Sequence, residues 1–249
     1  MRRKITVIST MLLLVSLLLT ALFSPLAAGE SSRGGTFLPL GWDARGQGLG
    51  GAATILIRDD RSAYWNPANL TFLMSPSFSL GTTKPVPDLD NRYSIFSIGT
   101  GLLDTRSENR ADVAVRRFGA ALSVTHLGLK LAGGSNWSES TIGISGAFSP
   151  NHYNSVGFTW RMLRHWSDLD DTDASGMALD IGWTALLRKR LWLGVVGRNV
   201  FSTISYPHRD EEIDPTWNIA LAYEGLLDRI STECDAVLKN GELNRFLAG

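Results

Sequence analysis

Cysteine and charge are both scarce in this sequence, and each scarcity excludes a class of protein. Cys234 is the only cysteine among 249 residues, so no disulfide can form within the chain. Charged residues make up 19% of the sequence, below the roughly 25% of an ordinary soluble domain. The net charge of +0 and the pI of about 6.9 argue against a nucleic-acid-binding surface.

Motifs for catalysis and metal binding are also missing. The four histidines show neither H-x-x-H nor H-E-x-x-H spacing; they are His126, His152, His165 and His208. No G-x-S-x-G nucleophile motif occurs, and the lone cysteine has no recognisable base. We therefore expect no enzyme, with no catalytic residue, no cofactor and no metal site.

One acidic stretch leaves a metal-binding alternative open. Asp168, Asp170, Asp171 and Asp173 fall within six residues, and carboxylates at alternate positions can bind calcium. The stretch lacks the glycine and the late glutamate of a helical calcium loop. The favoured interpretation is a solvated acidic loop, with calcium binding as the alternative.

The N-terminus predicts export from the cytoplasm. Residues 1–29 have the three parts of a signal peptide: a basic start at Arg2–Lys4, an apolar core at Ile5–Phe23, and small residues for cleavage after Ala28 or Gly29. The core is long enough for an uncleaved membrane anchor as the alternative. After this segment no apolar run could form a membrane-spanning helix, so any further membrane insertion must use β-structure.

From about Ser75 onward, apolar residues recur with a period of two, which is typical of β-strands. In the segment 153–163, large apolar side chains share one face and small or polar residues share the other. About ten strands of the length needed to cross a membrane are predicted. They are 75–83, 92–100, 118–127, 141–149, 153–163, 176–187, 191–200, 216–224, 229–239 and, weakly, 242–249.

The residues on the less apolar face separate two kinds of β protein. A soluble sandwich normally presents Lys, Glu and Arg on its wet face, whereas here that face carries Gly, Ser, Thr and Ala. Short turns near 149–152 and 188–190 alternate with the longer links 164–175 and 201–215, as on the two rims of outer-membrane barrels. The fold class predicted is all-β, an antiparallel transmembrane β-barrel.

The most informative segment is 41–70, GWDARGQGLGGAATILIRDDRSAYWNPANL. It has dense glycines, then two acids, then a Trp-Asn-Pro-Ala box in which Asn-Pro predicts a turn. Its first glycines also fit the dinucleotide fingerprint G-x-G-x-x-G. The residues before them include Pro39 and Asp43, which disfavours the buried strand that this fingerprint needs. The motif residues are Gly46, Gly48, Gly50, Gly51, Asp59, Asp60, Trp65, Asn66, Pro67 and Ala68.

This box resembles the N-terminal signature of the FadL/PorV superfamily of bacterial outer-membrane β-barrels, with Leu49 where that family often has Met and Asn69 where it often has Gly. The resemblance covers 41–70 and roughly 140–240. It implies a hatch inside the barrel at 30–73 and a barrel at 74–249. It further implies a location in outer-membrane lipid and a role in protein secretion or in transport of hydrophobic molecules, so the expected partners are secretion-machinery proteins, cargo proteins or such molecules.

Four charged residues fall on the small-residue face of the predicted strands and are expected to face the lumen: Arg161, Asp180, Arg198 and Glu224. Their simplest role is ion pairing from wall to wall or from wall to hatch. Barrels of the resembled family have about fourteen strands, so about ten strands predict an incomplete barrel. The alternative function is a non-transporting structural or interaction protein of the envelope, or a degenerate barrel fragment.

Overall fold

The computed structural model describes residues 43–104, 116–130, 133–168, 173–226 and 230–249. The predicted signal peptide at 1–29 and the first part of the predicted hatch, 30–42, lie outside the described residues. Among the described residues no helix has both the length and the apolar character required to span a bilayer.

The chain forms one large antiparallel sheet, and the prediction of an all-β fold is confirmed. Consecutive strands are neighbours throughout, except that β8 pairs only with β7 and β9 follows β7 in the sheet. The strands are β1 Ser77–Thr83, β2 Asn91–Asp104, β3 Arg116–Lys130, β4 Asn136–Asn151, β5 Asn154–Ser167, β6 Ala174–Arg188, β7 Leu191–Ser205, β8 Asp210–Glu211, β9 Thr216–Leu226, β10 Ile230–Lys239 and β11 Glu242–Ala248.

All ten predicted strands are present, but several are longer than the sequence indicated. Residues 164–167 and 201–205 continue β5 and β7, so those parts of the two predicted links are strand rather than loop. The two-residue strand β8 was not predicted, because it is too short to show a period. Pairing in the sheet extends strands beyond the point where their side-chain alternation is clear.

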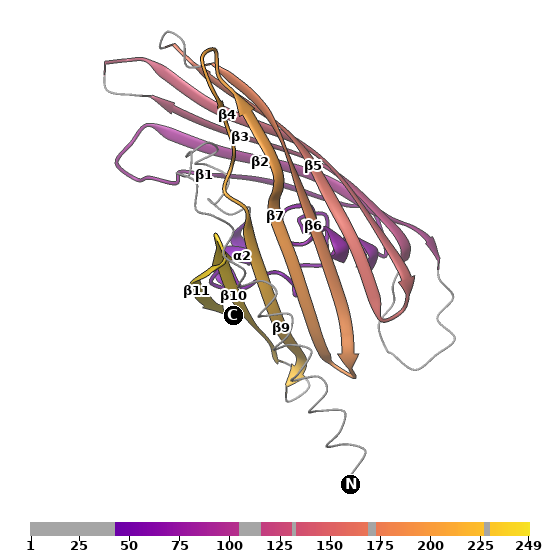
Figure 1. Cartoon of the computed structure of the whole chain (residues 1–249). Helices are drawn as coiled ribbons and strands as arrows, with labels where there is room; N and C mark the ends of the chain where they lie inside the picture. Colours follow the sequence, from indigo (N-terminus) through magenta and orange to yellow (C-terminus); the bar gives the residue numbers. More distant parts are fainter. Residues whose placement is uncertain (1–42, 105–115, 131–132, 169–172, 227–229) are drawn as a thin grey trace.

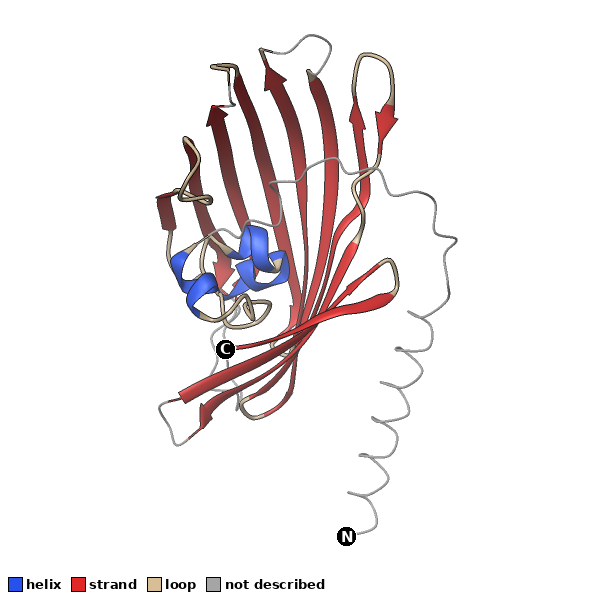
Figure 2. Ribbon diagram, turned by 90° about the vertical axis from the view of Figure 1, so that its left-hand side faces the viewer, coloured by secondary structure: helices blue, strands red, loops and turns tan. Residues whose placement is uncertain are grey.

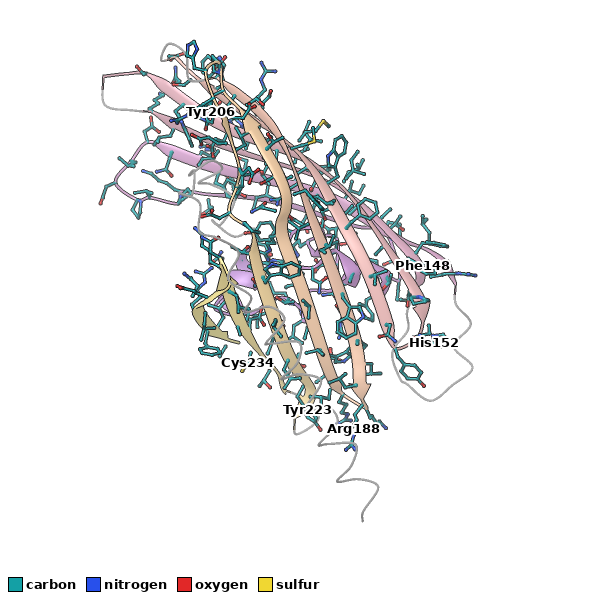
Figure 3. The ribbon with its side chains drawn as sticks, in the orientation of Figure 1. Phe148, His152, Arg188, Tyr206, Tyr223 and Cys234 are labelled. Carbon is teal, nitrogen blue, oxygen red and sulfur yellow. The ribbon has the colours of Figure 1, made fainter. Side chains whose placement is uncertain are left out.

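The two ends of the sheet are named here after connections that lie at them. Tight turns at His152–Tyr153 and Lys189–Arg190 define one end, called here the turn rim. The links 84–90 and 206–215 lie at the opposite end, called the loop rim. In Figure 3, Tyr206 lies toward the loop rim, while His152 and Arg188 lie toward the turn rim.

The two faces of the sheet have opposite character. On the outer face large apolar side chains are exposed, as the fractions for Leu122 (53%), Phe158 (49%) and Met177 (51%) show. The inner face buries small and polar side chains such as Ser123 and Thr184. In strands such as β4 and β5 the division into these two faces follows the predicted period of two.

A segment from Asp43 to Leu73, called here the inner segment, packs against the inner face. It contains α2 Ala44–Gly48, α3 Ser62–Trp65 and the 3₁₀ helix η2 Pro67–Phe72. Asp43 caps α2 by accepting hydrogen bonds from the amides of the first turn. Asn66 is extended, as expected before proline, and its side chain caps η2.

The sheet curves around the inner segment, as Figure 2 shows, while Figure 1 shows the strands running side by side from β2 to β7. Within the described residues β1 pairs only with β2, and β11 pairs only with β10. The described sheet is therefore open, with β1 and β11 as its edges. The architecture is barrel-like in its curvature and in its filled concave side.

Candidate functional site

A row of small residues crosses the inner face at right angles to the strands. Each member is paired with the next across neighbouring strands, which places all of them at the same height in the sheet. We call this row the glycine belt; its members are Gly101 on β2, Gly119 on β3, Ala147 on β4, Gly157 on β5 and Gly182 on β6.

The 3₁₀ helix η2 packs on the glycine belt. A Cβ on Gly119 would lie 2.4 Å from the carbonyl oxygen of Leu70. A Cβ on Gly157 would lie 2.5 Å from the backbone nitrogen of Ala68. Both contacts involve backbone atoms, which side-chain rotation cannot move. The glycines therefore let the backbone of η2 pack directly on the inner face of the sheet, which is called the wall below.

Asn66 fastens the start of η2 to β6. Its amide nitrogen donates to Thr184 Oγ1 at 3.0 Å and to the Trp183 carbonyl oxygen at 3.3 Å. Its Oδ1 accepts from the Ala68 amide at 3.1 Å and occupies the space that a Cβ on Gly182 would need. Asn66 is completely buried, so these bonds satisfy a side chain that has no access to water.

Asn69 ties two parts of the inner segment together. Its amide nitrogen lies within hydrogen-bonding distance of the carbonyl oxygens of Thr54 (2.9 Å), Ile55 (3.3 Å) and Ile57 (3.0 Å). Its Oδ1 accepts from Thr184 Oγ1 at 2.7 Å. Thr184 thus bonds both Asn66 and Asn69, which fixes η2 and the chain at 54–57 against one wall residue.

The chain at 54–57, which Asn69 contacts, is held from the opposite side by β10. Glu233 accepts from the amides of Ile55 at 2.7 Å and Leu56 at 2.9 Å. Asp235, two residues further along the inner face, accepts from Thr54 Oγ1 at 2.6 Å. Both acidic side chains are 1% exposed, so these bonds form in a dry contact between the inner segment and the wall.

The two adjacent acids of the motif point in different directions. Asp60 is fully buried and accepts hydrogen bonds from the hydroxyls of Ser77 on β1 and Ser97 on β2. Asp59 instead pairs with Arg61, whose Nε donates to Asp59 Oδ1 at 2.9 Å. Asp60 fastens the inner segment to the sheet, whereas Asp59 acts within the segment.

Arg61 joins Asp59 to the cap of α2. Its Nη1 lies 3.0 Å from Asp43 Oδ1, and the other Asp43 oxygen accepts from Trp65 Nε1 at 2.8 Å. Burial alone would raise the pKa of Asp59, but the hydrogen bonds and charge of Arg61 outweigh burial and hold that pKa below its usual value. Asp59 and Arg61 therefore form an ion pair that Arg61 extends to the cap of α2.

Arg58 is enclosed by aromatic rings. Its guanidinium carbon lies 4.5 Å from the Phe72 ring centroid and 4.3 Å from that of Trp192, the second ring belonging to β7. Its Nη1 forms an ion pair of 2.7 Å with Glu224, which also accepts from Trp192 Nε1 at 2.8 Å. The result is a cation–π and ionic anchor between segment and wall.

Arg161 and Asp180 form a buried pair within the wall. Arg161 Nη2 donates to Asp180 Oδ1 and to Asn199 Oδ1, each at 2.7 Å, and the Asn199 amide donates to Asp180 Oδ1 at 2.8 Å. The β6–β7 register shifts between Leu179 and Ile181, and Asn199 has a φ of +54°. This irregularity brings the Asn199 amide to the carboxylate.

Arg198 connects the wall to α3. Its guanidinium lies 4.6 Å from the Tyr64 ring centroid and 5.5 Å from that of Trp65, and its Nη2 donates to the Trp65 carbonyl at 3.3 Å. Of the four charged residues predicted to face the lumen, the structure thus places Arg161 and Asp180 in a wall-to-wall pair. Arg198 and Glu224 contact the inner segment.

The motif glycines serve separate local purposes. Trp65 fills the position that a Cβ on Gly46 would take, 2.3 Å from its Cζ2 atom. Gly50 and Gly51 have φ of +64° and +83°, which form the turn after α2. Gly48 has no atom within 4 Å of a built Cβ, so it makes no such contact. The dinucleotide fingerprint fails here, because a turn rather than a helix follows Gly51.

Among the described residues no group of three or more His, Cys, Asp or Glu side chains could hold a metal ion. Residues 169–172 of the acidic stretch lie outside the described residues. Asp168 accepts from the backbone and side chain of Asn136, and Asp173 accepts from the Ser167 amide. These bonds order the ends of the β5–β6 link.

Sequence reasoning missed several residues that hold the inner segment. Glu233 and Asp235 are two acids at alternate positions of a predicted strand, flanking Cys234, so the period of two could have placed both on the inner face. Arg58 had no such signal, because its partners come from distant parts of the chain. The glycine belt also had none, since it depends on the register of four strand pairs.

No protein-family model matches the sequence, and comparison with curated proteins and with solved structures finds no match either. The resemblance to the FadL/PorV superfamily therefore rests on the residues of the 41–70 box and of the strands between 140 and 240.

Proposed function

We propose that this protein is an outer-membrane β-barrel of the PorV/FadL type, whose inner segment is a hatch that closes the lumen. One observation carries the proposal: the sheet exposes its large apolar side chains on the outer face and buries hydroxyls and charges on the inner face. Phe158 is 49% exposed, whereas its strand neighbour Thr159 is 1% exposed.

This distribution suits lipid better than water. A soluble monomer rarely exposes a continuous apolar surface of more than a few hundred Å², yet exposed apolar side chains recur here along β2 to β6. The strands β3 to β7 have 14 to 16 residues, and a tilted membrane strand needs about 9–11. Each could cross the hydrocarbon and still extend beyond it.

The contacts of the inner segment support the hatch role. It bonds β1 and β2 through Asp60, β6 through Asn66, and β10 through Glu233. A segment bonded to strands on opposite sides of a curved sheet spans the space between them. Removing those bonds would open the lumen without breaking any strand pair.

The inner face between the hatch and the loop rim carries both polar and apolar buried side chains, so its chemistry is compatible with either branch of the resembled superfamily. Ser123, Thr125, Thr141 and Thr159 line the wall between the hatch and the loop rim, and all are buried and polar. Ile95 on β2, Leu163 on β5 and Ile204 on β7 are buried apolar residues of the same region. The proposed partners are outer-membrane lipid and proteins of a secretion machine or its cargo, with hydrophobic small molecules as the second candidate.

Membrane insertion can be tested with a lipid-facing charge. The full chain, exported in a Gram-negative host, should fractionate with the outer membrane and require detergent for release. Leu122→Arg, in the middle of β3, should destabilise the inserted protein by roughly 2–4 kcal/mol. The control Leu89→Arg changes an equally apolar residue in the 84–90 link, 45% exposed and away from the strands, and should have little effect.

Two results would contradict the proposal. One is recovery of the protein as a soluble periplasmic species without detergent. The other is an equal effect of the two arginine variants on unfolding in lipid vesicles. Either result would favour the alternative, a structural or interaction protein of the envelope.

A further inference from the structure

Three consecutive basic residues form the turn between β6 and β7. Arg188, Lys189 and Arg190 are all exposed at the turn rim, and we call them the basic turn. We propose that the basic turn binds the phosphate groups of anionic phospholipids at the edge of the bilayer, together with the tyrosines beside it. This inference rests on the proposed function, because it requires the outer face of the sheet to lie in lipid.

The first observation is that the basic turn lies where the apolar outer face ends. On β9 the outward side chains of Leu221 and Tyr223 are 49% and 40% exposed. Tyr223 is paired with Leu191, the residue that directly follows the basic turn. The amide of Glu224, the next residue of β9, donates to the carbonyl oxygen of Arg190 at 2.9 Å. The basic turn therefore begins where the apolar surface stops, which is the level of the headgroups in a bilayer.

The second observation is that an exposed tyrosine lies on each side of the basic turn. Tyr223 lies on the β9 side, and Figure 3 shows it at the same end of the sheet as Arg188. On the β5 side, the carbonyl oxygen of Tyr153 accepts from the Leu186 amide at 2.8 Å, and Tyr153 is 48% exposed. A tyrosine at the boundary of a bilayer keeps its ring near the hydrocarbon while its hydroxyl reaches the headgroups. The two tyrosines therefore suit the same boundary as the basic turn.

The third observation is the excess of positive charge at the basic turn. No acidic residue occurs in the sequence between Asp180 and Asp210. Glu224, whose backbone contacts the turn, directs its carboxylate to Arg58 Nη1 at 2.7 Å and to Trp192 Nε1 at 2.8 Å. That carboxylate therefore serves the anchor of the inner segment.

The loop rim has a different arrangement of charges. There Lys130 forms an ion pair with Asp90 at 3.4 Å, and Lys239 forms one with Asp214 at 2.9 Å. Basic residues at the loop rim thus alternate with acids, whereas those of the basic turn follow one another directly. An anionic surface would be attracted to the turn rim rather than to the loop rim.

These side chains are suited to the phosphate of a lipid. A guanidinium donates two parallel hydrogen bonds to phosphate oxygens, and an ammonium group has three donors. Each basic side chain therefore keeps donors for a phosphate even when it has another partner. Zwitterionic lipids carry a cationic amine beside the phosphate, which the basic turn repels, so anionic phospholipids such as phosphatidylglycerol are favoured. A free phosphate ion has no acyl chain to lie along Leu191 and Tyr223. Short turns of outer-membrane barrels face the periplasm, which assigns the lipid to the periplasmic leaflet.

Native mass spectrometry of the full chain measures the lipid preference. Released from mixed micelles with equal amounts of phosphatidylglycerol and phosphatidylcholine, the parent should carry mainly phosphatidylglycerol. Arg188→Gln with Lys189→Gln should reduce this preference roughly 30-fold, about fivefold for each basic residue lost. Arg190 is left unchanged because its φ of +72° forms the turn. The matched control, Lys84→Gln with Arg209→Gln, removes two exposed basic residues at the loop rim and should bind like the parent.

Three results would overturn the inference. The first is an equal preference in the parent and in the turn-rim glutamine variant. The second is an equal loss in the loop-rim control, because net charge rather than the position of the charge would then decide binding. The third is displacement of phosphatidylglycerol by inorganic phosphate at constant ionic strength, which would show an anion site without a role for the lipid.

Insertion into vesicles separates these results from the proposed function. The parent and the glutamine variant should both insert into vesicles of pure phosphatidylcholine, because the apolar outer face is unchanged. Insertion of both, with equal preference for phosphatidylglycerol, overturns the lipid site and leaves the membrane barrel standing. A parent that inserts neither into these vesicles nor into vesicles with phosphatidylglycerol refutes the proposed function and this inference with it.

Discussion

Gly157→Ala is expected to displace the inner segment while leaving the sheet intact. The new Cβ would lie 2.5 Å from both the backbone nitrogen of Ala68 and the carbonyl carbon of Pro67, and 2.7 Å from the Pro67 oxygen. Ordinary van der Waals contact begins near 3.4 Å. Since all three neighbours are backbone atoms, η2 must move away from β5 by roughly 1 Å.

The cost follows from what that movement disturbs. Overpacking in a tight contact costs about 1–3 kcal/mol. A shift of η2 also stretches the bonds of Asn66 to Thr184 and of Thr71 to Ser155, which are 3.0 Å and 2.7 Å long and worth about 1 kcal/mol each. The expected loss in docking free energy is about 2–4 kcal/mol. The strand itself loses nothing, because alanine is at least as compatible with β-structure as glycine.

Hydrogen exchange of the amides at 62–72 measures this docking free energy, because these amides exchange when the inner segment detaches from the sheet. Exchange in detergent or nanodiscs should accelerate by roughly 30-fold to 1000-fold. The amides of the central strands should remain protected as in the parent. Gly128→Ala is the matched control, since its Cβ would meet only His126 Nε2, at 3.6 Å. If the two variants exchange alike, the glycine belt is not the surface on which the inner segment docks.

Three further predictions concern the bonds that hold the inner segment. The pKa of Asp59 lies below its ordinary value, so the contribution of Asp59 to docking should be present in full above about pH 4 and should be lost as the pH falls through the folded-state pKa. Asp59→Asn should remove this contribution in the same exchange assay. Replacing Asn66 and Pro67 by alanine should raise solute leakage in liposome swelling with assembly unchanged, and leakage equal to that of the parent would refute the hatch role. Arg58→Met should lower the free energy of unfolding by about 2–4 kcal/mol, because Glu224 keeps its charge without its partner. Arg58→Lys should recover little of this loss, since a lysine stacks less well on aromatic rings.

The fold was largely accessible from the sequence because strand periodicity is a local signal. In the segment 153–163 the alternation of Phe158 and Trp160 with Thr159 and Arg161 already separates the two faces. The sequence also indicated which face of the sheet is covered by protein, because small residues such as Gly157 leave space on one side only. The ends of the strands could not be predicted from the sequence, since pairing extends β5 to Ser167, beyond the residues in which the alternation is clear.

The candidate site was accessible only in part. The Trp-Asn-Pro-Ala box marks the start of η2 through local backbone rules, and these rules fixed the conformation of Asn66. Its partner Thr184 lies 118 positions further along the chain. The hydrogen bond from the Ile55 amide to Glu233 joins residues that are 178 positions apart in the chain. Contacts at such separations depend on the register of every intervening hairpin, which no local pattern encodes.

The glycine belt also has a consequence for assembly. In an antiparallel pair, a slip by one residue turns every side chain to the opposite face. A slip of β5 by two residues keeps the faces but brings Ser155 or Thr159 to the height of Gly157. Either residue would place a side chain where η2 must sit. Only the native register of the strands leaves room for the inner segment, so its docking is a check that the wall has been paired correctly.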